Sequence, residues 1–146
     1  MKSYLAIGLN LPPTKEDSFP HVTIIPPFEH KVELDHVKER LISELKKVSP
    51  LKTLYFGRVT TFGPPGKPIK VRLVQEPDQI EYLKCLRHLA ETTLISALPG
   101  FELDQTWDFN PHCSASSLRQ EGEVATTGLF LRTGIDGPIP ANNIRI

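Results

Sequence analysis

The sequence has no excess of charge of either sign and no long hydrophobic run. Seventeen lysines and arginines balance seventeen aspartates and glutamates over 146 residues, so the chain as a whole has no electrostatic field that would attract duplex nucleic acid or an anionic membrane. No apolar stretch reaches the roughly 20 residues that a membrane-spanning helix needs, and the residues after Met1 lack a signal-peptide profile. We therefore expect a cytoplasmic protein that binds neither duplex DNA nor membranes.

Cysteine is also scarce. Cys85 and Cys113 form neither a CxxC pair nor a disulfide-rich pattern. One lies in a helix-like and the other in a strand-like context, so both are expected to be free, partly buried thiols, with Cys113 facing the core. The GxGxxG, Walker A, HExxH, GxSxG and EF-hand patterns are absent as well. We expect no cofactor and no metal.

The composition is that of a compact globular domain. Apolar residues make up 39% of the chain and charged residues 23%, which argues against a disordered chain or a coiled coil. The length suffices for a single domain, residues 1–146, which could consist of two packed halves. The sequence is silent on oligomeric state, and a monomer is the simplest expectation.

Hydrophobic periodicity predicts six strands and two amphipathic helices. The predicted strands are Tyr4–Leu9, Phe19–Ile25, Leu51–Val59, Ile69–Val74, Trp107–Ser116 and Glu123–Ile135; the predicted helices are Val32–Val48 and Asp78–Leu98, with a loop at Thr61–Pro68 and a Gly/Pro/Asn-rich tail. Prolines are expected to close the first two strands. This order favours an α+β fold of two small halves, each with one helix and mainly antiparallel pairing, over a doubly wound parallel sheet.

Two of the five histidines stand in the same local pattern. His21 is followed two residues later by Thr23, and His112 is followed two residues later by Ser114. A proline precedes each histidine, and a phenylalanine stands just upstream of each proline. Because residues i and i+2 of a strand point to the same face, each imidazole is expected beside its own hydroxyl. Two such strands facing one another would form a site of four groups.

These four groups suit acid–base chemistry at a phosphoester. A neutral imidazole accepts a proton from water or a hydroxyl, a protonated one gives a proton to a leaving oxygen, and a histidine pKa of about 6.5 makes both forms available near neutrality. The hydroxyls would hold the non-bridging phosphate oxygens in place of a metal ion. The pattern predicts His21, Thr23, His112 and Ser114 as catalytic residues.

Both motifs resemble those of the 2H phosphoesterase superfamily, in particular its LigT-like members, the 2'-5' RNA ligases and cyclic phosphodiesterases. The segments PHVTIIPPF at residues 20–28 and NPHCSA at residues 110–115 carry the resemblance, and the order of elements agrees over most of the chain. It implies a bilobal fold of two pseudo-symmetric lobes, with helices outside and the motifs facing across a central cleft. It also implies a metal-independent phosphodiesterase acting on nucleotides or RNA termini with 2',3'-cyclic phosphates or 2'-5' linkages.

Other interpretations stay open at this point. Some small phage-encoded members of the superfamily degrade cyclic oligonucleotides or 2'-5'-linked nucleotide signals of antiviral defence, which changes the substrate but not the chemistry. A binding module that holds a nucleotide or RNA end without turnover would be indicated by loss of a histidine or hydroxyl, and all four are present. A zinc site of His21, His112 and Cys113 is disfavoured, because the adjacent His112 and Cys113 should point to opposite faces of a strand.

The two histidine motifs do not specify which cationic side chain contacts the phosphate besides the four motif residues. Ser117 stands where LigT-like members often carry an arginine, and the resemblance leaves Arg119 as a substitute. The competing cations are Arg132, Arg72, Lys70 and Lys67.

Aromatic residues are candidates for stacking a nucleobase or, equally, for packing in the core or loops. These candidates are Tyr4, Phe28, Phe62 and Trp107. The histidines without a hydroxyl partner two residues later are expected to be solvated or to pack, and they are His30, His36 and His88.

Overall fold

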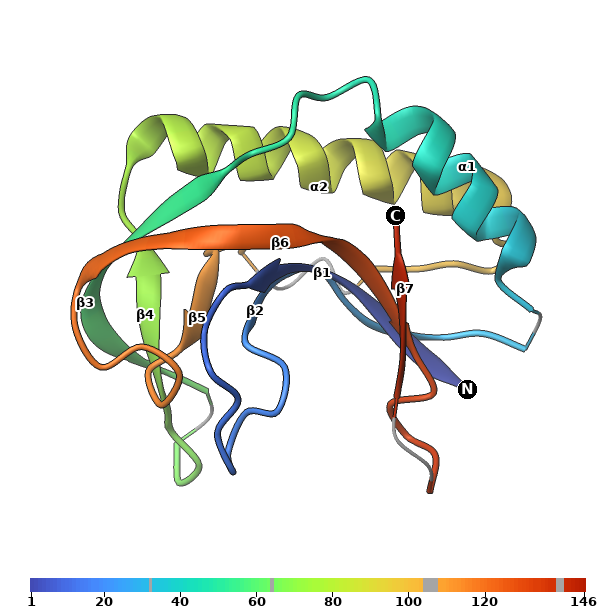
Figure 1. Cartoon of the computed structure of the whole chain (residues 1–146). Helices are drawn as coiled ribbons and strands as arrows, with labels where there is room; N and C mark the ends of the chain where they lie inside the picture. The colour runs from blue at the N-terminus through green and yellow to red at the C-terminus, as the bar shows by residue number, and fades with distance from the viewer. Residues whose placement is uncertain (32, 64, 104–107, 139–140) are drawn as a thin grey trace.

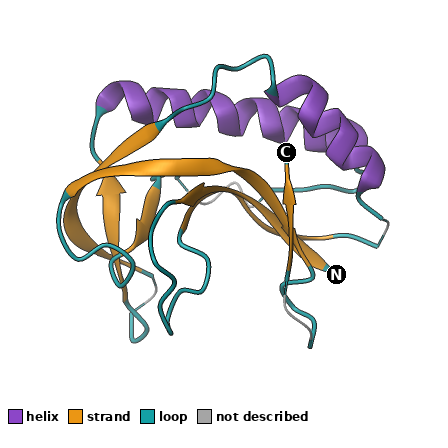
Figure 2. Cartoon of the chain, viewed as in Figure 1, coloured by secondary structure: helices purple, strands orange, loops and turns teal. Residues whose placement is uncertain are grey.

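The computed structural model describes residues 1–31, 33–63, 65–103, 108–138 and 141–146. Within these ranges the chain forms seven strands and two helices (Figures 1 and 2). They follow in the order β1 (Lys2–Leu9), β2 (His21–Glu29), α1 (Asp35–Leu45), β3 (Thr53–Phe62), β4 (Ile69–Val74), α2 (Pro77–Ala97), β5 (His112–Ser114), β6 (Gly122–Thr133) and β7 (Asn142–Arg145). The expected α+β class is confirmed.

The strands form one sheet in which every described pairing is antiparallel. The strand order is β2-β1-β6-β3-β4-β5, and β7 is added beside β6. Residues 126–133 of β6 pair with β1, whereas residues 122–125 pair with β3. The sheet curls, with both helices over its convex side (Figure 1). This curl brings β2 and β5 into contact although they stand at opposite ends of the strand order.

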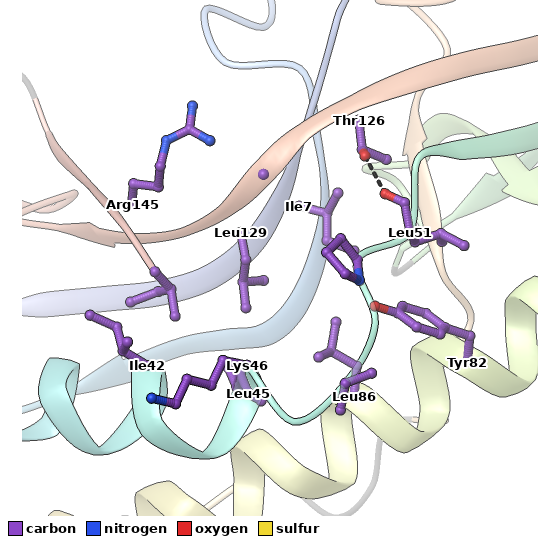
Figure 3. A pocket seen from close by; sticks show the side chains of 14 residues that line it. Ile7, Ile42, Leu45, Lys46, Leu51, Tyr82, Leu86, Thr126, Leu129 and Arg145 are labelled. Atoms are coloured by element: carbon purple, nitrogen blue, oxygen red, sulfur yellow. Dashed lines mark hydrogen bonds between the residues drawn. The ribbon is translucent and has the colours of Figure 1, made fainter.

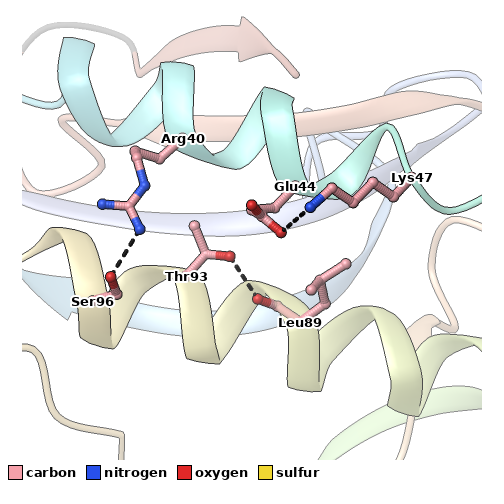
Figure 4. Close-up of polar contacts among 6 residues, drawn as sticks. All are labelled: Arg40, Glu44, Lys47, Leu89, Thr93 and Ser96. Carbon is pink, nitrogen blue, oxygen red and sulfur yellow. Dashed lines mark hydrogen bonds and ion pairs between the residues drawn. The ribbon is translucent and has the colours of Figure 1, made fainter.

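The helices bury one face each, as the apolar spacing predicts. On α1 this face consists of Val37, Leu41 and Leu45, and on α2 it includes Leu83, Leu86 and Leu94. The two helices also meet through a polar contact, because Arg40 Nη2 donates a 2.8 Å hydrogen bond to Ser96 Oγ (Figure 4). The helical layer closes the core and leaves the concave side of the sheet uncovered by helices.

A cavity of about 420 Å³ remains between the sheet and the helices (Figure 3). Its lining is mostly aliphatic and includes Ile7, Leu129 and Leu45. Arg145 also borders the cavity, but its guanidinium lies on the side of the sheet opposite the helices (Figure 3).

The second strand continues past the point where the sequence predicted its end. Pro26 and Pro27 lie inside β2, which runs on to Glu29. An edge strand can hold prolines because its outer N–H groups need no partner, and β2 is an edge strand. The register against β1 also shifts between Ser3 and Leu5, opposite these prolines, as at a β-bulge. The prolines therefore interrupt the register without ending the strand.

Other boundaries also differ from the predicted ones. The first helix spans Asp35–Leu45, whereas Val32 lies outside the described residues. The third strand reaches Phe62, because pairing with β4 continues through residues that the sequence assigned to a loop. The fifth strand covers only His112–Ser114, and Trp107 lies outside the described residues.

The tail contains a strand that the sequence analysis missed. β7 pairs with β6 from Asn142 opposite Thr133 to Arg145 opposite Phe130. Two asparagines begin this segment, and asparagine is depleted in strands. Only the neighbouring β6 supplies the partner that makes the segment a strand.

Both cysteines are free, as predicted, but the predicted burial holds only for Cys113. Cys113 is buried and belongs to the core, whereas Cys85 is exposed on α2 and not partly buried as expected. Burial raises the pKa of the Cys113 thiol to about 12. None of the described helices is long and apolar enough to span a bilayer.

Truncating Phe56 should destabilise the fold strongly. This side chain is fully buried in β3, at a position paired with both β4 and β6. Phe56→Ala is expected to lower the free energy of unfolding by about 3–5 kcal/mol. Val59→Ala, on the same strand but 42% exposed, should cost less than about 1 kcal/mol. Urea denaturation measures both, and equal losses would contradict this account of the core.

Candidate active site

The four residues of the repeated motif line one pocket. His21 and Thr23 lie on β2, and His112 and Ser114 lie on β5. All four border a pocket of about 300 Å³. Alternation along each strand places the histidine and its hydroxyl on one face, and the curl of the sheet brings the two strands together. The pocket is completed by Glu16, Asp17, Ile69, Lys70, Val71 and Cys113.

Both imidazoles are held by the same local hydrogen bond. Nδ1 of His21 lies 2.5 Å from the carbonyl oxygen of Phe19, and Nδ1 of His112 lies 2.7 Å from that of Asn110. A carbonyl oxygen can only accept, so Nδ1 is the donor in each case. This fixes the tautomer and leaves Nε2 of each neutral ring as the proton acceptor. The residue before each proline is biased towards extended backbone, which explains why the motif repeats this geometry.

Aromatic rings pack against each histidine. The rings of Tyr4 and Phe19 lie 5.2 and 5.6 Å from the His21 ring, and the Phe19 ring is stacked with an interplanar angle of 20°. The Phe62 ring meets the His112 ring edge-on at 4.8 Å. These contacts restrict the orientation of both imidazoles.

The surroundings of His21 change its protonation equilibrium. Burial lowers the pKa of His21 below its ordinary value, and the charges of Arg132 and His112 act in the same direction. The hydrogen bond to Phe19 and the charge of Asp17 oppose this effect but do not cancel it. The neutral form of His21 is therefore favoured near neutral pH.

The loops beside the pocket are joined by hydroxyl contacts. Ser117 Oγ donates a 2.8 Å hydrogen bond to Asp17 Oδ2, which ties the loop before β2 to the loop after β5. Ser114 Oγ and Ser116 Oγ lie 2.8 Å apart. The first of these contacts links residues 100 positions apart in the chain. It thus helps to hold β2 and β5, the two strands that carry the histidines, next to each other.

The predicted substrate contacts separate into two groups. Tyr4 and Phe62 adjoin the histidines, as described above. Phe28 is only 6% exposed and packs edge-on against Phe101 in the core, so it offers no free face for stacking. Arg119 is exposed but is not among the residues that line the pocket.

Among the competing cations, only Lys70 lines the pocket. Arg72 is buried and donates to the carbonyl oxygens of Gly57, Leu118 and Arg119 at 2.9, 2.6 and 2.5 Å. It therefore fixes the loop after β5 and does not face the pocket.

Sequence reasoning missed Phe19 and Asp17 as parts of the site. Phe19 supplies both the carbonyl and the ring that position His21. The repeated phenylalanine upstream of each proline was a signal for it. Asp17 has no such signal, because its contact with Ser117 depends on the folded arrangement of the two loops.

The structure also shows where the other three histidines lie, and it bears on the alternative of a zinc site. His30 is buried, with Nε2 2.7 Å from Ser3 Oγ, whereas His36 and His88 are exposed on the helices. No group of three or more His, Cys, Asp or Glu side chains in the described ranges is arranged to hold a metal ion. Cys113 has a raised pKa, which disfavours the thiolate that zinc requires.

Comparison with known proteins identifies a family. The family model described as the 2'-5' RNA ligase superfamily matches residues 6–127. No curated protein and no solved structure matches the chain. The matched range contains both histidine motifs and all elements from β2 to β5.

Stability should depend on pH through His21. The unfolded histidine titrates near 6.5, and the folded one titrates lower because it is buried. As the pH falls below about 6.5, the unfolded state binds the proton first, so the free energy of unfolding decreases. Urea denaturation between pH 8 and 5 should show a smaller decrease for His21→Gln than for the wild type. The control His88→Gln changes an exposed histidine; a His21→Gln curve parallel to that of the wild type would contradict the assigned shift.

Proposed function

Because the chain belongs to the 2'-5' RNA ligase superfamily, we propose that it is a metal-independent phosphodiesterase that cleaves nucleotide or RNA phosphodiesters by acid–base catalysis. Its substrates are 2',3'-cyclic phosphates or 2'-5' linkages. The observation that carries this proposal is the pair of histidines in one pocket, each with Nδ1 bound to a backbone carbonyl. Each Nε2 is thereby left to accept or donate a proton.

The environment of His21 favours it as the general base. Its lowered pKa keeps it neutral, as a base must be before the reaction. Nε2 of His21 removes a proton from water, or from the neighbouring ribose hydroxyl in a transesterification, while that oxygen forms a bond to phosphorus. His112 acts as the general acid, and its Nε2 gives a proton to the ribose oxygen as the bond from phosphorus to that oxygen breaks. His21 has then gained a proton and His112 has lost one, so the two histidines have exchanged protonation states.

The two hydroxyls complete the mechanism. Thr23 and Ser114 share the pocket with the imidazoles, and we assign them to the non-bridging phosphate oxygens. Donors fixed before the reaction stabilise charge that develops on those oxygens without reorganisation. Together with the imidazolium, they supply the charge compensation that a metal ion supplies in other phosphodiesterases.

The two halves of the sheet fit the bilobal organisation of the superfamily. Each half contributes one edge strand that carries a histidine motif, and β6 runs through both halves. We interpret β1, β2 and α1 as belonging to one lobe and β3, β4, β5 and α2 to the other. The pocket between β2 and β5 corresponds to the central cleft in this interpretation.

Removing either histidine should abolish most of the turnover. His21→Ala and His112→Ala are each expected to lower kcat by about 10²–10⁴-fold, because proton transfer contributes an effect of this size. His88→Ala, which removes an exposed histidine on α2, is the matched control. A product assay in the presence of a chelator, with 2',3'-cyclic nucleotides and 2'-5'-linked oligoadenylate, measures the loss.

The same assay separates the proposal from its competitors. Activity in the double mutant His21→Ala/His112→Ala would remove the two-histidine mechanism. Activity that appears only when a divalent metal is added would instead favour metal chemistry. Binding of these compounds by the wild type without conversion would make the protein a nucleotide-binding module.

A further inference from the structure

The face of the sheet that carries His21 continues across β1, β6 and β7. Antiparallel partners point to the same face. His21 pairs with Gly8, which pairs in turn with Gly128. A Cβ atom placed on Gly8 would lie 3.0 Å from the ring of Phe130, which stands two residues beyond Gly128 on β6. This face thus leads from the pocket towards the end of β6.

Two arginines lie on this face, each over an aromatic ring. The Arg132 guanidinium lies 4.6 Å from the centre of the Phe19 ring, and the Arg145 guanidinium lies 4.9 Å from that of Phe130. The two rings meet edge-on at 5.6 Å. We call Arg132 and Arg145, with these two supporting rings, the two-arginine surface.

Neutral partners hold both arginines in place. Arg132 donates to Tyr4 Oη at 2.6 Å and to Asn143 Oδ1 at 2.7 Å. Arg145 donates to the carbonyl oxygen of Thr127 at 2.8 Å. No carboxylate in the described ranges forms a salt bridge with either guanidinium. Among the described residues, both guanidinium groups are therefore oriented without an ion pair, on a chain whose net charge is zero.

The surface adjoins the proposed base directly. The Phe19 ring is stacked on the His21 ring at 5.6 Å and contacts the Arg132 guanidinium at 4.6 Å, so one ring separates His21 from the first arginine. Arg145 is a diagonal cross-strand neighbour of Arg132, a relation that separates such residues by about 7–8 Å. The two cations therefore follow one another in a row that leads away from the pocket.

We propose that Arg132 and Arg145 form a second phosphate-binding subsite, for phosphates one or two nucleotides from the reacting one. Its ligand is a single-stranded oligonucleotide. Guanidinium forks bind phosphate oxygens in pairs, and their planes also stack unpaired bases. A mononucleotide would leave this surface empty. The inference rests on the proposed function, because His21 and His112 define which phosphate reacts.

Binding in a His112→Ala background tests this subsite without turnover. The probes are fluorescein-labelled oligoadenylate tetramers, one linked 3'-5' with a terminal 2',3'-cyclic phosphate and one linked 2'-5', and unlabelled 2',3'-cyclic AMP as competitor. Arg145→Gln is expected to weaken tetramer binding by about tenfold. The logarithm of the binding constant falls linearly with the logarithm of the salt concentration. For Arg145→Gln this slope should become shallower by about 0.7 for each phosphate that the variant no longer neutralises. Arg145→Lys should restore the salt dependence, because it keeps the charge.

Arg40→Gln is the matched control. Arg40 lies on α1, on the helical side of the sheet, and its Nη2 bonds Ser96 (Figure 4). Equal tetramer affinities for Arg145→Gln and Arg40→Gln would overturn the subsite, as would tetramers that bind no more tightly than the mononucleotide. Circular dichroism confirms that each variant remains folded.

Turnover by the protein with its native histidines separates the two proposals. Arginine-dependent tetramer binding without cleavage of any probe would leave the subsite standing and overturn the proposed phosphodiesterase. Cleavage of 2',3'-cyclic AMP with no preference for tetramers would support the proposed phosphodiesterase and overturn the subsite. Preference for the 3'-5' tetramer with a cyclic end indicates an RNA terminus as the substrate, and preference for the 2'-5' tetramer indicates a nucleotide signal.

Discussion

Strand β6 pairs with β1 along one part of its length and with β3 along the other, and the position of the site depends on this continuity. It makes one sheet out of two halves whose histidine motifs lie on opposite edges. A flat sheet would keep β2 and β5 apart, with β1, β6, β3 and β4 between them. Because strands twist and the sheet curls away from the helical layer, the two edges meet on the concave side (Figure 1). Packing on the convex side thus creates the pocket on the concave side.

A local hydrogen bond in each motif decides which ring nitrogen of the histidine can react. The carbonyl two residues before each histidine holds Nδ1, so Nε2 is left for chemistry. The two imidazoles share this geometry but not their surroundings. His21 is packed between aromatic rings and has a lowered pKa, whereas His112 meets a single ring edge-on. Groups with like chemistry in unlike environments can take opposite parts in proton transfer.

The surroundings of each arginine decide whether its charge can attract an anionic substrate. Acidic and basic residues are equal in number, so attraction of an anionic substrate must come from particular side chains. Arg72 cannot contribute, because three backbone carbonyls surround its guanidinium. Arg132 and Arg145 are instead held by neutral groups, and Arg132 lies over the ring that packs against the proposed base. A sequence count of arginines makes no distinction between these two situations.

The α+β class, most of the elements and the four residues of the repeated motif can be predicted from the sequence, because strand and helix periodicities and the i, i+2 pairing are local properties. The predicted end of the first strand before Pro12 and Pro13 agrees with β1, which ends at Leu9. The predicted end of the second strand at Pro26 and Pro27 is wrong, because β2 is an edge strand and continues through both prolines. Phe28 and Tyr4 look alike as aromatic candidates, yet one packs in the core and the other contacts His21. These differences become visible only in the folded chain, as do the pairing of β7 and the contact between Asp17 and Ser117. Each depends on which residues from distant parts of the chain become neighbours, and that is fixed by the curl and register of the whole sheet.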